Sequence, residues 1–284
     1  MAEDVSKAVL ITGCSSGIGR ATAERLAQGD WPVYATARRL DSIADLEEKG
    51  CRLLALDVCD EQSMAAAVTA VEAEHGAVGV LVNNAGYSQS GAVESVPMDQ
   101  VRRQFETNVF GLLRLTQLVL PGMRRQRWGR VVNLSSMGGR LTFPGGGIYH
   151  ASKHAVEALG DALRFEVRGF GIDVVTIEPG LIRTEFGETA VGSLAAPQSN
   201  GGPYGEFNAA VGKATAEAYD SGPLSKLGAG PDAVARTIER AIKSRRPRAR
   251  YRVTASAKLL LTQRRMMPDR AWDAFLRSQF PQPK

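Results

Sequence analysis

Short apolar runs alternate with amphipathic segments along most of the chain. The amphipathic segments carry apolar residues at helical spacing, and the runs between them are short, nearly continuous and typical of strands buried on both faces. Strands that alternate with helices predict an α/β fold, a doubly wound parallel sheet with helices on both faces. The predicted strands are Ala8–Thr12, Trp31–Thr36, Arg52–Asp57, Val78–Asn83, Arg130–Leu134, Asp173–Ile177 and Arg250–Val253, and the predicted helices include a segment through Ala27, Asp41–Lys49, Glu61–His75, Met98–Arg127, a segment holding Tyr149, and Asp232–Lys243.

Three features interrupt this pattern. Pro121 is expected to kink or end the long helix Met98–Arg127. Residues 185–228 are rich in Ala, Gly, Ser and Pro, which favours a mobile lid over the edge of the sheet where ligands bind in such folds. Ser256–Phe280 has a helical pattern interrupted at Pro268. We therefore predict one domain over residues 1–254 and a basic helical extension over residues 255–284.

Composition narrows the class of protein. The chain has 284 residues, of which 44% are hydrophobic, enough for a large core without disulfides. Its three cysteines form no CxxC pair, which favours free thiols in a reducing compartment. We find no signal-peptide pattern and no apolar stretch of about 18 residues, so we expect a cytoplasmic protein without a membrane span.

Positive charge is concentrated near the carboxyl end. The net charge is +5, but residues 236–284 hold 14 Lys and Arg against 3 Asp and Glu. Such a tail could contact an acidic partner, a membrane surface or nucleic acid, or it could be a solvated helix face beside an edge strand. The basic run Arg245–Arg250 lacks a reader fold and interleaved stacking aromatics, so we expect no nucleic-acid partner.

A glycine-rich turn follows the first predicted strand. Gly13, Gly17 and Gly19 lie between that strand and the first helix. Glycines there let the backbone approach a pyrophosphate, and the helix N-terminus supplies N–H donors and a partial positive charge. The alternative is a strand–helix turn that binds nothing.

Tyr149 and Lys153 are four residues apart on a predicted helix, which places the phenol and the ammonium on one face. Ser136 precedes them at the end of a predicted strand. Reduction of a carbonyl needs a proton as well as a hydride, and an ordinary Tyr has a pKa of about 10. We expect the positive charge of Lys153 to lower the pKa of Tyr149. In isolation, the pair would be an amphipathic surface pair, and the Ser a turn residue.

Together these motifs resemble the short-chain dehydrogenase/reductase family. The turn has the spacing TGxxxGxG, and the likeness continues in Asn83–Gly86, Asn108, the Ser136–Tyr149–Lys153 set, and Pro179-Gly180 followed by Thr184. The resemblance covers about residues 6–254 and implies a single-domain Rossmann-type sheet of about seven strands. Cys14–Gly17 and Val33–Thr36 resemble the branch that contains 17β-hydroxysteroid and retinol dehydrogenases.

The resemblance also implies roles for individual residues. Tyr149 is the general acid/base, Lys153 tunes it and binds ribose, and Ser136 donates to the substrate oxygen. Asn108 bends its helix and holds a water that links Lys153 to solvent. A cap of the next helix is the alternative for Asp57. The implied cofactor-binding residues, which also include Tyr149 and Lys153, are Gly13, Ser15, Ser16, Gly17, Ile18, Gly19, Arg38, Asp57, Val58, Asn84, Ala85, Gly86, Pro179, Gly180, Ile182 and Thr184.

Charge at the end of the second strand bears on the choice of dinucleotide. An acid there would accept from a ribose 2′-OH and repel a 2′-phosphate. Thr36 occupies the place where we expect an NAD-preferring member to carry Asp, and Arg38 can meet a 2′-phosphate. We therefore expect NADP(H) to be preferred over NAD(H), although Ser16 stands where many NADP-preferring members carry a second basic residue.

The expected substrate is a hydrophobic ketone or secondary alcohol. We expect the walls of the substrate pocket to be Tyr87–Gln89, the segment from Met137 to Gly146, and Phe186 with the lid. Arg140 is the one charged residue of the middle segment. A catalytically silent NADP(H) sensor or scaffold, and an epimerase or dehydratase on the same fold, stay open. We expect no metal site, because no third ligand accompanies His150 and His154. The resemblance favours a homodimer or homotetramer.

Overall fold

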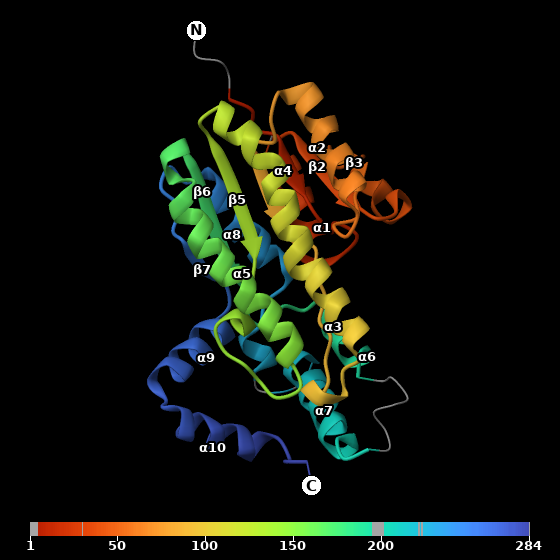
Figure 1. Cartoon of the computed structure of the whole chain (residues 1–284), viewed down its shortest axis with the longest axis vertical. Coiled ribbons are helices and arrows are strands. Elements are labelled where there is room, and N and C mark those ends of the chain that lie inside the picture. Colours follow the sequence, from red (N-terminus) through yellow and green to blue (C-terminus); the bar gives the residue numbers. More distant parts are fainter. Residues whose placement is uncertain (1–4, 30, 195–201, 221, 223, 284) are drawn as a thin grey trace.

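Seven parallel strands form one sheet in the order β3-β2-β1-β4-β5-β6-β7 (Figure 1). The computed structural model describes residues 5–29, 31–194, 202–220, 222 and 224–283. The order reverses at the β1–β4 pair, which is the position where doubly wound sheets bind ligands. The strands are β1 (Val9–Ile11), β2 (Val33–Ala37), β3 (Arg52–Ala55), β4 (Val80–Asn83), β5 (Gly129–Leu134), β6 (Ile172–Glu178) and β7 (Arg250–Arg252).

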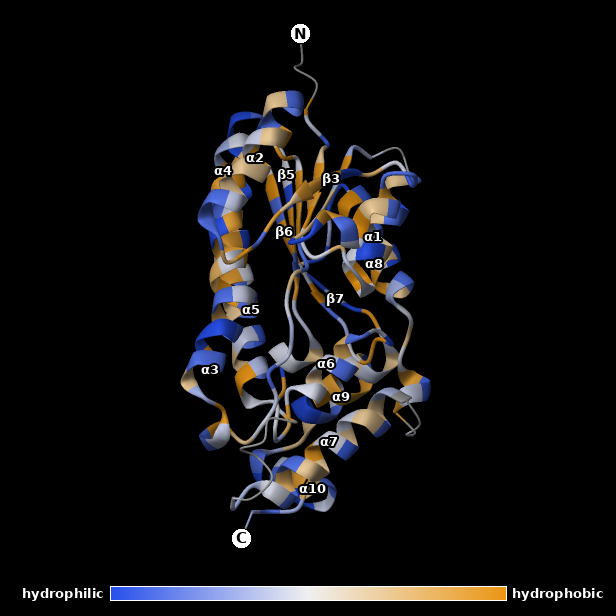
Figure 2. Ribbon diagram, turned by 90° about the vertical axis from the view of Figure 1, so that its right-hand side faces the viewer, coloured by the Kyte–Doolittle hydropathy of each residue, from blue (hydrophilic) through white to orange (hydrophobic). Residues whose placement is uncertain are grey.

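Helices cover both faces of the sheet, as Figure 2 shows with the sheet seen between two helical layers. One layer holds α1 (Gly17–Ala27) and α8 (Pro231–Lys243), and the other holds α2 (Glu61–His75), α4 (Gly111–Arg125) and α5 (Gly147–Glu166). The alternating side chains of β1 separate two cores: Val9 and Ile11 pack on the α1–α8 side and Leu10 on the α2–α4 side. The α/β fold predicted from the sequence is confirmed.

The long helix predicted over Met98–Arg127 is interrupted, but not at the proline. It consists of α3 (Met98–Phe105), a π-helical turn η3 (Glu106–Phe110) and α4, which continues past Pro121 to Arg125. The expectation that Pro121 ends the helix was therefore wrong. The irregularity lies at the π turn instead, and such turns are frequent at functional sites.

The segment predicted as a lid contains two helices, α6 (Phe186–Gly192) and α7 (Gly205–Asp220), and a 3₁₀ turn η7 (Ser225–Leu227). Both helices lie beyond the carboxyl ends of the strands (Figure 1). Part of the predicted lid, residues 195–201, lies outside the described residues. The other short turns are η1 (Leu40–Leu46), η2 (Val93–Ser95), η4 (Met137–Gly139) and η5 (Arg168–Phe170).

The carboxyl-terminal extension forms α9 (Ala255–Met266) and α10 (Asp269–Gln279), separated near Pro268 as predicted. It packs on its own subunit: Leu260 and Leu261 contact Leu141, and Trp272 is buried with its ring 5.8 Å from that of Phe143. The extension therefore supports the segment that precedes the Tyr149 helix.

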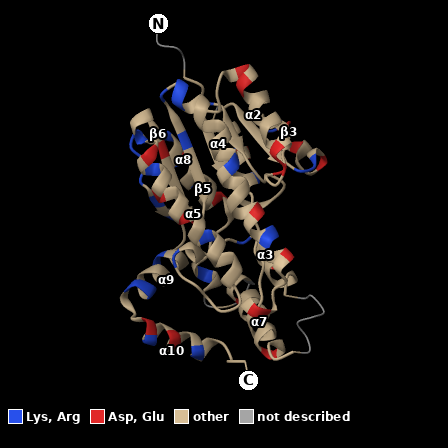
Figure 3. Cartoon of the chain, viewed as in Figure 1, with Lys and Arg blue, Asp and Glu red and all other residues tan. Residues whose placement is uncertain are grey.

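Several basic residues of the tail form ion pairs, and Figure 3 shows Lys and Arg alongside Asp and Glu on α10. Arg250 forms ion pairs with Glu157, Asp161 and Glu178, and Arg264 pairs with Asp269. These pairs favour the interpretation of the tail as an edge strand and solvated helix faces.

Candidate active site

A cavity of about 1440 Å³ opens at the carboxyl edge of the sheet. It extends from the turn after β1 to the amino-terminal end of α5. Most sequence-predicted site residues line it: Gly13, Ser15, Ser16, Gly17, Ile18, Arg38, Asp57, Val58, Asn84, Ala85, Gly86, Ser136, Tyr149, Lys153, Pro179, Gly180, Ile182 and Thr184. The other two predicted site residues, Gly19 and Asn108, are buried and do not line the cavity.

The glycine-rich turn has little room for side chains. Gly13 and Gly17 adopt φ of +72° and +57°, a region that side chains rarely enter. At Gly19 an added Cβ would lie 2.2 Å from the Gly13 carbonyl oxygen and 2.4 Å from Asn84 Nδ2. Asn84 Nδ2 in turn donates to the carbonyl oxygens of Thr12, at 2.8 Å, and Gly13. The turn after β1 is thus held against the turn after β4, with the N-terminus of α1 at the cavity.

The end of β2 corrects one sequence expectation. Thr36 is fully buried and its Oγ1 donates to the Ile11 carbonyl at 2.8 Å, so its side chain does not reach the cavity. Ala37 and Arg38 line the cavity instead. The side chain that would meet an adenosine ribose at the end of β2 is therefore that of Ala37, not Thr36.

Asp57 is not the cap of the following helix. Its Oδ1 accepts from the Cys59 N–H at 2.9 Å, whereas Asp60 caps α2 by accepting from Gln62 and Ser63. Asp57 and Val58 both line the cavity beside Ala37. The capping alternative was wrong, and the Asp57 side chain fixes the turn after β3.

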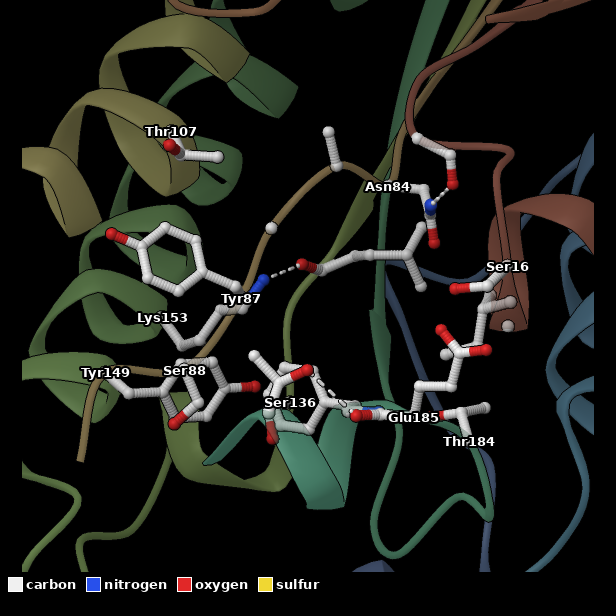
Figure 4. Close-up of a pocket in the computed structure, with 18 of the residues that line it drawn as sticks. Ser16, Asn84, Tyr87, Ser88, Thr107, Ser136, Tyr149, Lys153, Thr184 and Glu185 are labelled. Atoms are coloured by element: carbon white, nitrogen blue, oxygen red, sulfur yellow. Dashed lines mark hydrogen bonds between the residues drawn. The ribbon is translucent and has the colours of Figure 1, made fainter. Parts of the chain in front are cut away.

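Ser88, Ser136 and Tyr149 lie together in the cavity, with Lys153 beside them, and Ser16, Thr184 and Glu185 lie on the opposite side (Figure 4). Ser136 lies two residues after the end of β5, and its Oγ accepts from the Gly138 N–H at 3.0 Å, which leaves the hydroxyl hydrogen available. Lys153 Nζ donates to the Leu134 carbonyl at 2.7 Å and lies 5.9 Å from the centroid of the Tyr149 ring. The loop after β4, the loop after β5 and α5 thus bring these four side chains to the same part of the cavity.

Burial controls the pKa values of this pair. Burial raises the pKa of the Tyr149 phenol above its ordinary value, and a hydrogen bond with Ser136 acts against that rise. Burial lowers the pKa of Lys153 from 10.5 to about 8, while the charge of Glu157 opposes that fall. The expected fall in the Tyr149 pKa is therefore not found in the protein alone, because desolvation of the phenolate outweighs the attraction of an ammonium that points to a backbone carbonyl.

Asn108 occupies the π turn and is buried. Its Oδ1 accepts from the Tyr87 N–H at 3.1 Å, and its Nδ2 donates to the Tyr87 carbonyl and to Ser152 Oγ. At Gly86 an added Cβ would lie 3.0 Å from Asn108 Oδ1 and 3.7 Å from Lys153 Nζ. The π turn therefore places an amide between the loop after β4 and the helix of Tyr149.

Pro179, Gly180, Ile182 and Thr184 follow β6 along one side of the cavity. The Pro179 carbonyl accepts from the Met137 N–H at 2.8 Å, and the Leu181 N–H donates to Ser256 Oγ at 3.2 Å. A Cβ on Gly180 would meet Thr254 Oγ1 at 2.3 Å. The start of the carboxyl-terminal extension therefore holds this loop in place, a contact that sequence patterns did not indicate.

The substrate wall differs in part from expectation. Met137, Phe143, Tyr87, Ser88 and Phe186 line the cavity as predicted, and the Phe186 ring lies 5.4 Å from that of Tyr149. Other expected wall residues do not line it: Gln89, Arg140, Leu141 and Pro144. Leu141 turns instead toward the apolar residues of α9, and Gln89 is bonded to Gln104.

Sequence reasoning missed His150 and Tyr219, which both line the cavity. His150 is neutral, because burial lowers its pKa to about 4, and its Nδ1 accepts weakly from the Phe143 N–H at 3.4 Å. Its position beside Tyr149 was the available signal. Tyr219 lies 70 residues farther along, in the Ala-rich α7, where no pattern distinguishes it.

Two other classes of site receive no support within the described part of the chain. No cluster of three His, Cys, Asp or Glu side chains there is arranged to hold a metal ion. None of the described helices has the length and apolarity to cross a membrane.

Comparisons with known proteins agree with this geometry. A family model described as short chain dehydrogenase matches residues 7–192. The uncharacterized oxidoreductase YusZ of Bacillus subtilis (strain 168) is 34% identical over 282 residues, covering 96% of this chain and 98% of that protein. An NADPH-dependent 3-dehydrocapnine reductase of Ornithobacterium rhinotracheale is 36% identical over 278 residues, covering 93% and 94%.

A solved structure adds to these matches. The crystal structure of a short-chain dehydrogenase from Streptomyces avermitilis resembles this fold with a TM-score of 0.76 at 32% identity, covering 92% of this chain and 93% of that one. The chain therefore belongs to the short-chain dehydrogenase family. It is an oxidoreductase that acts on CH–OH groups and their carbonyl counterparts.

Proposed function

We propose that this protein is an NADP(H)-dependent reductase or dehydrogenase of hydrophobic ketones and secondary alcohols. The observation that carries the proposal is the convergence of Ser136, Tyr149 and Lys153 at one end of a cavity whose other end is the turn after β1. The Ornithobacterium relative is named as an NADPH-dependent reductase, which supports the choice of cofactor.

The residues at the far end fit a dinucleotide phosphate. Gly13, Gly17 and Gly19 leave backbone and the N-terminus of α1 open to a pyrophosphate, at positions where side chains would collide. Arg38 lines the cavity next to Ala37, so the end of β2 offers a guanidinium to a 2′-phosphate and carries no carboxylate of its own. The other residues that we expect to bind the cofactor also line the cavity: Ser15, Ser16, Ile18, Asp57, Val58, Asn84, Ala85, Gly86, Pro179, Gly180, Ile182 and Thr184. When bound, NADPH supplies the hydride.

The protein supplies the proton and stabilises charge. Tyr149 Oη holds the proton that reaches the substrate oxygen, and the raised pKa of the phenol keeps it protonated in the free protein. Ser136 Oγ–H donates to the same oxygen as negative charge develops on it. Lys153 passes its ammonium proton to the phenolate that remains, and it regains a proton from solvent, toward which Asn108 connects it through the loop after β4.

Apolar side chains near this group favour a hydrophobic substrate. Met137, Phe143 and Phe186 line the catalytic end, and Trp272 backs Phe143 from behind. Such walls with few polar groups suit a mid-sized apolar carbonyl compound. The resemblance to 17β-hydroxysteroid and retinol dehydrogenases points the same way.

The test is oxidation of NADPH in the presence of a panel of apolar ketones, with Tyr149→Phe and Ser136→Ala as variants. We expect turnover by the wild type, loss of at least about 100-fold in kcat without the phenol, and tight NADPH binding by all three proteins. Binding without turnover in the wild type would favour a silent sensor. Turnover unchanged by Tyr149→Phe would refute the assigned roles.

We further propose a homodimer or homotetramer that pairs through the α4–α5 face. Phe110 and Phe165 are exposed on this side of the molecule, at 52% and 85% of their surface, which is unusual for Phe. Sedimentation of the wild type and of Phe165→Glu tests this pairing. A monomeric wild type would contradict it.

A further inference from the structure

Two further hydroxyls open into the catalytic end of the cavity. Ser88 and Tyr219 both line it, and neither side-chain oxygen has a hydrogen-bond partner among the described residues. Ser88 Oγ and Tyr219 Oη are not among the unpartnered polar atoms that solvent cannot reach, so both are accessible from the cavity. The reactions assigned to Ser136 and Tyr149 leave these two hydroxyls unused.

Ser88 is held in position from both sides. The Gln104 side chain donates to the Tyr87 carbonyl at 2.8 Å and accepts from the Gln89 N–H at 2.6 Å. Gln104 is fully buried, and Ser88 itself is only 4% exposed. The Ser88 backbone is therefore fixed, and its side chain lines the cavity together with Ser136 and Tyr149 (Figure 4).

Tyr219 lines the same cavity from the lid helix α7. Its ring packs on Gly187, where an added Cβ would lie 3.0 Å from Tyr219 Cγ. The preceding residue, Phe186, contacts Tyr149, so consecutive residues of α6 touch the two phenols. A negative charge on Tyr219 would raise the pKa of Tyr149. Burial raises the pKa of Tyr219 to about 12, so its hydroxyl stays protonated at neutral pH.

We propose that Ser88 and Tyr219 bind a second polar group of the substrate, a hydroxyl or an amino group on the carbon next to the carbonyl. This deepens the proposed function and rests on it, because Ser136 and Tyr149 are taken to serve the carbonyl oxygen. Both additional hydroxyls can donate or accept, so they suit either group. The substrate class is then an α-hydroxy or α-amino ketone whose apolar remainder lies against Phe143.

Selectivity follows from the cost of leaving these hydroxyls without partners. An unsubstituted ketone would displace water from Ser88 and Tyr219 and offer no hydrogen bond in return. A site built to bond a substrate hydroxyl or amine therefore rejects the analogue that lacks it. Phe186 and the neighbouring apolar walls would add affinity equally for both compounds.

The experiment uses ketones of one carbon skeleton that carry a hydroxyl, an amino or a methyl group next to the carbonyl. NADPH oxidation gives kcat/KM for the wild type, Tyr219→Phe and Ser88→Ala. Tyr204→Phe is the matched control, since that phenol, directly before α7, donates to Glu94 and does not line the cavity. We expect the wild type to prefer the polar substituents by about 10-fold or more, and each cavity variant to lose about 3- to 10-fold on them.

The methyl-substituted ketone distinguishes a failure of the Ser88 and Tyr219 assignment from a failure of the proposed reductase function. We expect Tyr219→Phe and Ser88→Ala to turn over the methyl-substituted ketone at a rate within about twofold of the wild-type rate. Each substitution removes only a hydrogen bond that this compound cannot make. Equal losses on all three compounds would show a structural role and overturn the inference, as would a wild type without preference. Good turnover without preference leaves the reductase function standing, whereas no turnover of any compound overturns both.

Discussion

Replacing Lys153 with Met should stabilise the free protein at pH 7 while abolishing reduction. Burial lowers the pKa of Lys153 from 10.5 to about 8, so the folded state holds an ammonium in an unfavourable environment. That shift corresponds to about 3 kcal/mol, at about 1.4 kcal/mol for each pKa unit. The hydrogen bond from Nζ to the Leu134 carbonyl works in the other direction, and its loss should cost about 1–2 kcal/mol. We expect a net gain of about 1–2 kcal/mol.

The pH dependence identifies the source of that gain. Because the pKa of Lys153 is lower in the folded state, the unfolded chain binds more protons between pH 8 and 10.5. The stability contributed by this site therefore rises with pH across that window, and the full penalty is present below pH 8. The Lys153→Met protein has no such group, so its advantage over the wild type should disappear, and reverse, as the pH approaches 10.5.

The assay is urea unfolding of wild type and Lys153→Met, without cofactor, at pH 7 and pH 10. Lys49→Met is the control, because Lys49 is exposed and contributes no comparable desolvation. Other groups also titrate in this range, but they cancel in the difference between proteins. A Lys153→Met protein that is less stable at pH 7, with a difference from wild type that does not vary with pH, would refute the reasoning.

Three further substitutions test other parts of the site. Ala37→Asp should lower the ratio of NADPH to NADH in kcat/KM by about 10-fold or more, because a carboxylate would then face the 2′-phosphate; an unchanged ratio would contradict this. Gly19→Ala should weaken NADPH binding, measured by cofactor fluorescence, whereas Gly169→Ala, where an added Cβ meets nothing and which does not line the cavity, should not. Trp272→Ala should lower stability by about 3 kcal/mol in urea unfolding and admit bulkier ketones past Phe143; a broadened substrate range without destabilisation would not fit.

The sequence allowed the sheet and most of the cavity to be predicted because local signals were strong there. The central strands β1, β4 and β5 lie in short, largely apolar runs, and the turns that end β1, β4 and β6 carry glycines or asparagines with direct roles in the geometry. The Tyr149 and Lys153 pair needs only helical periodicity to reach one face. In such segments the local pattern and the tertiary structure agree, so prediction succeeds.

Contacts between distant segments could not be predicted in this way. Tyr219 enters the cavity because α6 and α7 pack together, and Ser256 accepts from the Leu181 N–H because α9 begins against the loop after β6. Neither arrangement has a periodicity or a motif in the sequence. The predicted direction of the Tyr149 pKa shift was wrong for the same reason. Desolvation depends on every group packed around the phenol, whereas the sequence shows only the neighbouring lysine.

The error at the end of β2 shows how small a shift changes a functional conclusion. Side chains alternate between the two faces of a strand, so a displacement of one residue moves a position to the opposite face. Tyr34 packs in the α2–α4 core and Ala35 in the α1–α8 core, and Thr36 returns to the side of Tyr34. A carboxylate at Thr36 would therefore be buried without a partner and would destabilise the fold before it could meet a ribose. At Ala37 the same carboxylate would face the cavity, and only there does the substitution measure cofactor preference rather than folding.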